Sequence, residues 1–144
     1  MDIVVDANLL VALATQHPQR QIVYQQFASW IAQQDVVLHA PDLAYAEVTN
    51  ALTRMITAKM LSRDQVQAIC QQLMELPIQY HIVGVDPDVI DIALRLSRKT
   101  AYDAVYLVLV QRLGAVLWTL DSPLYRNAIG QGYSVRLLGE IEQS

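Results

Sequence analysis

The chain has 144 residues and a net charge of −4; 53% of its residues are hydrophobic and 17% are charged. These values exclude a disordered chain and argue against broad, sequence-independent nucleic-acid binding, which depends on a basic surface. The single cysteine, Cys70, excludes an intrachain disulfide and a multi-cysteine zinc site, and it fits a reducing, cytoplasmic location. The length fits one domain over residues 1–144, and the apolar content leaves room for a homodimer interface.

The N-terminal segment does not have the pattern of an export signal. The first residues, MDIVVDANLLVALA, contain Asp2 and Asp6 and lack the basic segment that opens a signal peptide. No apolar run approaches the ~18 residues that a membrane-spanning helix needs. A soluble cytoplasmic protein without a membrane segment is therefore expected.

Short apolar runs rich in β-branched residues alternate with helical patterns along the chain. The predicted strands cover residues 3–5, 36–40, 80–85, 115–120 and 134–138. The predicted helices cover residues 8–14, 18–33, 43–59, 63–76, 87–98, 101–113 and 123–128. This alternation is typical of parallel strands joined by helices. The sequence therefore predicts an α/β fold, a three-layer α/β/α sandwich with a mainly parallel central sheet.

Capping signals mark the starts of three predicted helices. Asp42 is expected to cap the helix over 43–59. Ser62 with Gln65, and Thr100 with Asp103, have the spacing of a capping box. The helix that follows Asp103 is apolar nearly all round, so it is expected to be buried at the centre of the fold.

Four acidic residues adjoin apolar runs: Asp6, Glu47, Asp103 and Asp121. Asp6 and Asp121 follow predicted strands, beyond whose carboxyl ends ligands bind in open parallel sheets. An unpaired carboxylate in an apolar setting costs several kcal/mol, so four of them suggest one shared role. Oxygen ligands suit hard cations such as Mg²⁺ or Mn²⁺.

Each acid also has a purely structural explanation. Asp6 could form a turn that leads into a helix, and Asp121 precedes Ser-Pro, a good helix start. Asp103 could interact with the dipole of its own helix, and Glu47 could belong to an exposed stripe with Arg54. The functional interpretation therefore depends on the four acids lying together.

Other polar residues could support such a site. Asn50 and Arg54 share a helix face with Glu47, three and seven residues further on. Thr119 precedes Asp121 by two residues and could supply a hydroxyl to the same region. The three histidines, His17, His39 and His81, show no metal-binding spacing and are expected to be structural or to lie at the surface.

Three segments, VVDANLLVAL, PDLAYAEVTNAL and AYDAVYLVLVQRLGAVLWTLD, in this order and spacing resemble the motifs of PIN-domain nucleases. They are most similar to the VapC-like toxins of bacterial and archaeal toxin–antitoxin pairs. The resemblance spans nearly the whole chain and implies a PIN-like nuclease domain over residues 1–144. It further implies a homodimer and a cognate antitoxin whose C-terminal segment lies along the acidic cleft.

The resemblance implies that Asp6, Glu47, Asp103 and Asp121 hold one or two Mg²⁺ or Mn²⁺ ions and that the protein hydrolyses RNA phosphodiester bonds. Asn8 stands where the family often has Ser or Thr, and its polar side chain keeps a supporting role. A cation held by these acids would lower the pKa of a bound water, which would attack phosphorus.

Basic residues next to the acids are candidates for RNA contact. Arg98 and Lys99, with Arg95, precede Asp103 and could steer the RNA backbone, and Arg54 faces the same region in the predicted helix. A solvated helix end whose cations complement the helix dipole explains Arg95, Arg98 and Lys99 equally well.

Two other functions remain open. A PIN fold used only as a catalytically silent binding module would be marked by loss of acids, and all four are present. A Mg²⁺-dependent phosphatase of the haloacid-dehalogenase type needs a second aspartate two residues after the first and a threonine two residues later. Asn8 and Leu10 occupy those positions.

Overall fold

A five-stranded parallel sheet organises the computed structural model, which describes residues 1–97 and 101–139. Its strands are β1 (Asp2–Val5), β2 (Val37–Pro41), β3 (Ile78–His81), β4 (Val116–Thr119) and β5 (Val135–Leu137). They lie in the order β3-β2-β1-β4-β5, and each neighbouring pair is parallel. The predicted parallel sheet is confirmed.

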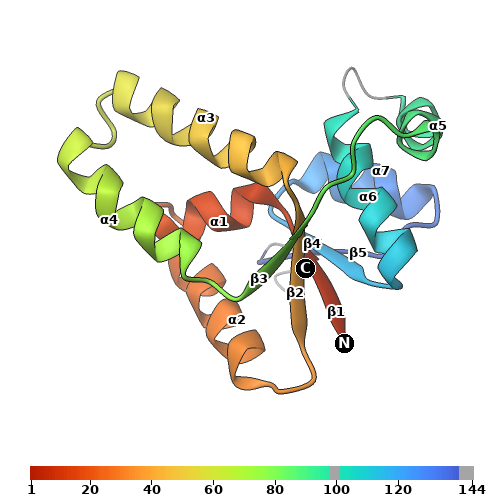
Figure 1. Ribbon diagram of the computed structural model, residues 1–144, viewed down its shortest axis with the longest axis horizontal. Coiled ribbons are helices and arrows are strands. Elements are labelled where there is room, and N and C mark those ends of the chain that lie inside the picture. The colour runs from red at the N-terminus through yellow and green to blue at the C-terminus, as the bar shows by residue number, and fades with distance from the viewer. Residues whose placement is uncertain (98–100, 140–144) are drawn as a thin grey trace.

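Helices cover both faces of this sheet (Figure 1). They are α1 (Ala7–Ala14), α2 (Arg20–Ala32), α3 (Leu43–Thr57), α4 (Arg63–Met74), α5 (Pro87–Leu96), α6 (Tyr102–Leu113) and α7 (Ser122–Gly130). In Figure 1, α1 to α4 lie on the left of the sheet and α5 to α7 on the right. The predicted three-layer α/β/α sandwich is therefore confirmed, and α3 extends beyond the carboxyl end of the sheet.

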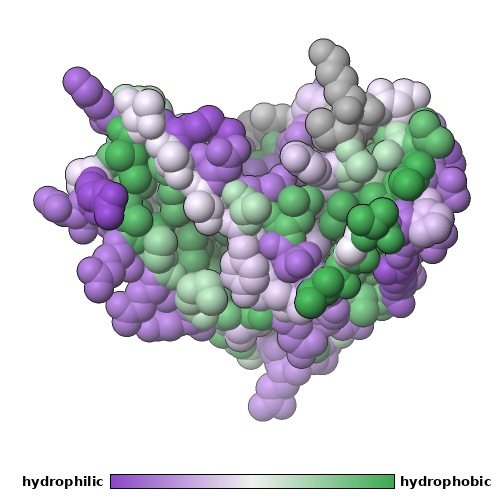
Figure 2. Space-filling view, turned by 45° about the horizontal axis from the view of Figure 1, so that its top comes forward, coloured by the Kyte–Doolittle hydropathy of each residue, from purple (hydrophilic) through white to green (hydrophobic). Residues whose placement is uncertain are grey.

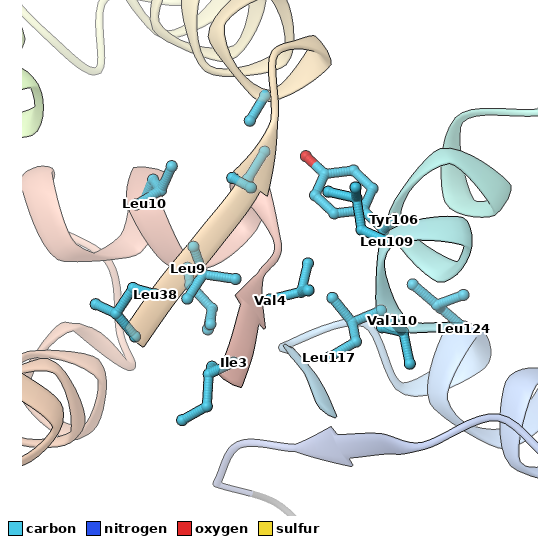
Figure 3. Close-up of a cluster of buried hydrophobic side chains, with 14 of the residues drawn as sticks. Ile3, Val4, Leu9, Leu10, Leu38, Tyr106, Leu109, Val110, Leu117 and Leu124 are labelled. Atoms are coloured by element: carbon cyan, nitrogen blue, oxygen red, sulfur yellow. The ribbon is translucent and has the colours of Figure 1, made fainter. Parts of the chain in front are cut away.

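The core forms where aliphatic side chains alternate across the central strands (Figure 3). Ile3 and Leu38 lie with Leu9 of α1 on one face of the sheet, whereas Val4 and Leu117 lie toward α6 on the other. This alternation follows from the two-residue period of strand side chains. Helix α6 is buried on most sides, as its apolar sequence predicts.

The third strand differs from its prediction. Residues 80–85 were expected to be extended, but β3 covers Ile78–His81 and lies at an edge of the sheet. Gly84 has a φ of +70°, which departs from strand geometry, and the side chains of Ile82 and Val85 are exposed. The β-forming residues of this segment therefore leave the sheet before α5 begins.

Three helix starts can be compared with the predicted caps. Ser62 and Gln65 form the predicted capping box of α4. Asp42 precedes α3, but its side chain makes no capping bond within the described residues, so the predicted cap does not form. Its backbone angles are αR, whereas an N-cap acceptor normally needs an extended backbone. Ala101 is the N-cap of α6, and Thr100 lies outside the described residues.

Two histidines have the structural role that was expected. His39 is buried in β2, where its Nε2 lies 2.8 Å from Asp2 Oδ1 and its Nδ1 lies 2.9 Å from His81 Nε2. This chain of contacts joins β1, β2 and β3. Across the described ranges, every helix is too short or too polar to cross a lipid bilayer.

Candidate active site

Two of the four acids follow neighbouring strands at the point where the strand order reverses. Asp6 follows β1 and Asp121 follows β4, and the two strands are paired in parallel. The Asp6 amide extends this pairing by donating to the Trp118 carbonyl at 3.1 Å. From this pair the chain continues toward β2 on one side and toward β5 on the other, which makes the crevice beyond their carboxyl ends the expected ligand site.

All four acids line one cavity of about 450 Å³ at this position. The cavity is lined by Asp6, Ala7, Asn8, Val11, His17, Glu47, Asn50, Ala51, Arg54, Tyr102, Asp103 and Asp121. The predicted face of α3, from Glu47 through Asn50 to Arg54, is therefore the face that lines it. His17 and Tyr102 also lie there, and the sequence interpretation did not include them in the site.

Thr119 holds the Asp6 carboxylate in place. Its hydroxyl is buried at the end of β4 and donates to Asp6 Oδ2 at 2.7 Å. The hydroxyl oxygen of Thr119 also accepts a hydrogen bond from Asn8 Nδ2 at 3.1 Å and one from the Asp121 amide at 3.0 Å. A hydroxyl has one hydrogen to donate and two lone pairs, so Thr119 uses its full capacity in these three bonds.

Asn8 connects the start of α1 to the end of β4. Its Nδ2 donates to Thr119, while its Oδ1 accepts from the Leu120 amide at 3.2 Å. The two bonds fix the orientation of the side-chain amide, because its nitrogen faces a hydrogen-bond acceptor and its oxygen faces a donor. Thr119 therefore contacts Asp6 directly, and Asn8 is linked to Asp6 through Thr119.

Tyr106 is a contact of Glu47 that the sequence interpretation missed. Its hydroxyl donates to Glu47 Oε1 at 2.6 Å, which joins α6 to α3. The ring is buried, and its oxygen points away from the aliphatic cluster and toward α3 (Figure 3). A signal existed: Tyr106 follows Asp103 by three residues within the mainly aliphatic stretch of its helix, and a buried tyrosine needs a partner for its hydroxyl.

Burial and neighbouring acids raise the pKa of two carboxyls in the cavity, Asp6 and Glu47. The pKa of Asp6 is raised to about 7, chiefly by burial and further by the charges of Glu47 and Asp103, while the bond from Thr119 opposes the shift. Burial also raises the pKa of Glu47, with a contribution from Asp103 and an opposing one from the Tyr106 bond. The cavity therefore concentrates negative charge at a cost that a bound cation would relieve.

Asp121 has the structural role that was considered for it, and it also lies in the acidic cavity. Its Oδ1 accepts from the Leu124 amide at 2.9 Å and caps α7. It also lines the acidic cavity, as does Asp103 in the first turn of α6. The structural explanation of Asp121 is correct, and it is compatible with a place in the site.

Two of the predicted RNA-contact residues, Arg98 and Lys99, lie outside the described residues. The predicted metal ligands can be compared with the structure. Within residues 1–97 and 101–139, no group of three or more His, Cys, Asp or Glu side chains is arranged so that it could hold a metal ion. The acids share a cavity, but their side chains do not form a ready-made coordination sphere.

The class of protein follows from sequence similarity as well as from this geometry. Residues 3–130 match the PIN domain, and the chain belongs to the PIN-domain family. It is 32% identical over 129 residues to ribonuclease VapC3 of Pyrobaculum aerophilum, a similarity that covers 86% of this chain and 92% of the relative. The resemblance to VapC-like PIN proteins is thereby confirmed.

Solved structures confirm the fold. PAE2754 from Pyrobaculum aerophilum has a TM-score of 0.68 and 22% identity, covering 88% of this chain and 79% of that one. VapBC2 from Rickettsia felis, solved with a DNA fragment from its promoter, has a TM-score of 0.66 and 11% identity, covering 96% of this chain and all of that one.

Proposed function

We propose that this protein is a divalent-cation-dependent endoribonuclease and the toxin of a toxin–antitoxin pair. The observation that carries the proposal is the single cavity in which Asp6, Glu47, Asp103 and Asp121 meet at the switch point of the sheet. Membership of the PIN family and the relative named ribonuclease VapC3 support the same activity.

Mg²⁺ or Mn²⁺ fits the donors of this cavity because both ions prefer carboxylate oxygens. Asp6, Glu47 and Asp103 would hold the cation, with Asp121 as a further ligand. A cation would also relieve the repulsion that raises the pKa of Asp6. Because the described carboxylates are not arranged as a cluster, they would have to move closer together on binding. The bound cation would activate water and stabilise charge on the phosphate.

The protein's own residues would orient the acids and the substrate. Thr119 restrains Asp6, and Tyr106 restrains Glu47, each through one short hydrogen bond. Arg54 lines the cavity, where its guanidinium would bind phosphate oxygens through bidentate hydrogen bonds. Such restraint matters because small displacements of reacting groups cost large factors in rate.

The test is cleavage of RNA by the purified protein, measured with a fluorophore–quencher oligoribonucleotide. We expect cleavage with Mg²⁺ or Mn²⁺, none with EDTA, and none from Asp103→Asn in either condition. Asp91→Asn, a change at an exposed acid of α5, is the matched control and should cleave normally. Activity that survives EDTA would rule out the cation mechanism. A folded protein that binds RNA or an antitoxin without cleaving would favour the silent binding module.

A second copy of the chain is the proposed partner for an apolar surface on α5 and the segment before it. Ile82, Val85, Ile90 and Leu94 form this surface and are 52% to 100% exposed. Figure 2 shows a green area over this side of the molecule, at the right. Apolar area of this kind favours association because burial removes it from water.

Light scattering at micromolar concentration tests the homodimer. The wild type should have the mass of two chains, and Leu94→Arg should yield one. Met74→Arg, at a similarly exposed apolar residue of α4, should leave the dimer intact. A monomeric wild type would contradict this proposal without affecting the nuclease proposal.

A cognate antitoxin is the second proposed protein partner. The similarity to the Rickettsia felis VapBC2 structure supports the idea of a two-protein system. Expression of the chain alone should arrest growth, and Asp6→Asn should abolish the arrest. Arrest by Asp6→Asn at the same protein level would refute the toxin role through RNA cleavage. Cytoplasmic action remains a prediction.

A further inference from the structure

A second groove continues from the acidic cavity along α3. It has a volume of about 650 Å³ and is lined by Leu43, Tyr45, Ala46, Glu47, Thr49, Asn50, Thr53 and Tyr102. Glu47, Asn50 and Tyr102 line both spaces, so the groove lies next to the cavity at an acid of the proposed active site. Its volume lies within the usual range of small-molecule sites, about 300–1,000 Å³.

Two tyrosines in this groove expose aromatic surface. Tyr102, the first residue of α6, is 55% exposed and lies at the junction of groove and cavity. Tyr45 is 40% exposed, and its ring stacks on Tyr80 with centroids 4.0 Å apart and an angle of 21° between the planes. The stack limits the movement of the Tyr45 ring, which makes it a firm wall of the groove.

Polar groups of α3 line the same groove. Thr49, Asn50 and Thr53 lie along one side of the helix. The Thr53 hydroxyl donates to the Thr49 carbonyl at 2.8 Å, so its remaining hydrogen-bonding capacity is as an acceptor. The Asn50 amide offers both a donor and an acceptor. Aromatic faces next to such groups suit a nucleobase, which presents a flat face for stacking and an edge for hydrogen bonds.

We propose that this groove binds an unpaired base of the RNA substrate next to the phosphodiester that is cut. The base stacks on Tyr102, its edge faces Asn50 and Thr49, and the adjoining phosphate lies at Glu47. The inference rests on the proposed nuclease function and adds to it a subsite for one unstacked base. A base inside a duplex is already stacked on its neighbours and cannot enter the groove.

Binding of a short single-stranded RNA that carries 2-aminopurine tests the groove. In EDTA, the wild type should quench 2-aminopurine fluorescence, since quenching reports stacking. Tyr102→Ala should weaken binding by about tenfold or more, whereas Tyr102→Phe keeps the ring and should bind like the wild type. Tyr24→Ala, at an equally exposed tyrosine of α2, is the matched control.

Cleavage kinetics with Mg²⁺ give a second readout. Because stacking holds the ground state and the transition state alike, Tyr102→Ala should raise KM and leave kcat nearly unchanged. The wild type should cut the single strand in preference to a duplex of the same sequence.

Three outcomes overturn the proposal. The first is a Tyr102→Ala variant with wild-type affinity and KM. The second is equal cleavage of duplex and single strand. The third is normal RNA binding by this variant with weakened binding of an antitoxin, which would assign the groove to a protein partner. Failure of the wild type to cleave any RNA would instead refute the proposed function itself.

Discussion

Replacing Asp6 by asparagine should stabilise the protein in the absence of metal. Its pKa rises from 3.8 to about 7 on folding, which corresponds to about 4 kcal/mol of unfavourable free energy once the carboxyl is ionised in both states. Asparagine removes the charge and can still accept a hydrogen bond from Thr119. Its amide hydrogens need new partners, so the net gain should be smaller, about 2 kcal/mol.

The stability difference between Asp6→Asn and the wild type should depend on pH. The folded protein retains the Asp6 proton up to about pH 7, whereas the unfolded chain releases it near pH 4. The contribution of Asp6 to the free energy of unfolding of the wild type is therefore most favourable at low pH, and it is lost as pH rises from about 4 to 7. The advantage of Asp6→Asn should grow across that window and stay constant above it.

Thermal unfolding in EDTA, followed by circular dichroism between pH 4 and 8, measures this effect. A gain of about 2 kcal/mol should raise Tm by about 6 °C at pH 8 for a chain of this size. Asp91→Asn, at an exposed acid, should leave Tm unchanged at every pH. Added Mg²⁺ should stabilise the wild type more than Asp6→Asn, which lacks one of the proposed ligands. The reasoning would be refuted by an Asp6→Asn variant that is less stable than the wild type at pH 8, or by a pH-independent difference.

Three further changes probe the surroundings of the site and the fold. Thr119→Val removes a hydroxyl that bonds Asp6, Asn8 and an amide, and it should cost about 1–3 kcal/mol in urea unfolding, with Thr119→Ser retaining most of the stability; an unchanged midpoint would contradict this role. The Tyr133 hydroxyl is buried and finds no hydrogen-bond partner in the described part of the chain, so Tyr133→Phe should be neutral or stabilising, and a clear loss would show a partner. Burial, with a contribution from His39, lowers the pKa of His81, so His81 should reduce the free energy of unfolding as pH falls below about 6.5. His81→Gln should remove this loss of stability at low pH. Identical stability–pH profiles for the variant and the wild type would contradict the prediction.

Most of the fold could be predicted because its local patterns agree with one another. The apolar strands around Ile3 and Leu117 alternate with helices whose starts and ends are marked in the sequence. One exception is the segment 80–85, whose residues favour a strand by type. Strand propensity reports how well a side chain suits a pleated surface, and it does not indicate where an edge strand ends. The positive φ of Gly84 and the exposure of Val85 became evident only in three dimensions.

The candidate site was only partly predictable, for a different reason. The sequence placed Asp6 and Asp121 at strand ends, and topology alone then brings them to one crevice. The contact between Tyr106 and Glu47 joins residues that are 59 positions apart, so no local pattern specifies it. Helical spacing limited Tyr106 to one side of its helix and left its partner undetermined.

The structure shows why acids can persist in this cavity despite their mutual repulsion. Asp6 accepts from a buried hydroxyl on β4, Glu47 accepts from a buried hydroxyl on α6, and Asp121 accepts from a backbone amide of α7. The two hydroxyl bonds lower the pKa of their carboxyls and so partly offset burial. Because each donor belongs to a different element of the fold, the carboxylates are held by the packing of β4, α6 and α7. A change that loosens any of these elements should therefore disturb the site before it unfolds the protein.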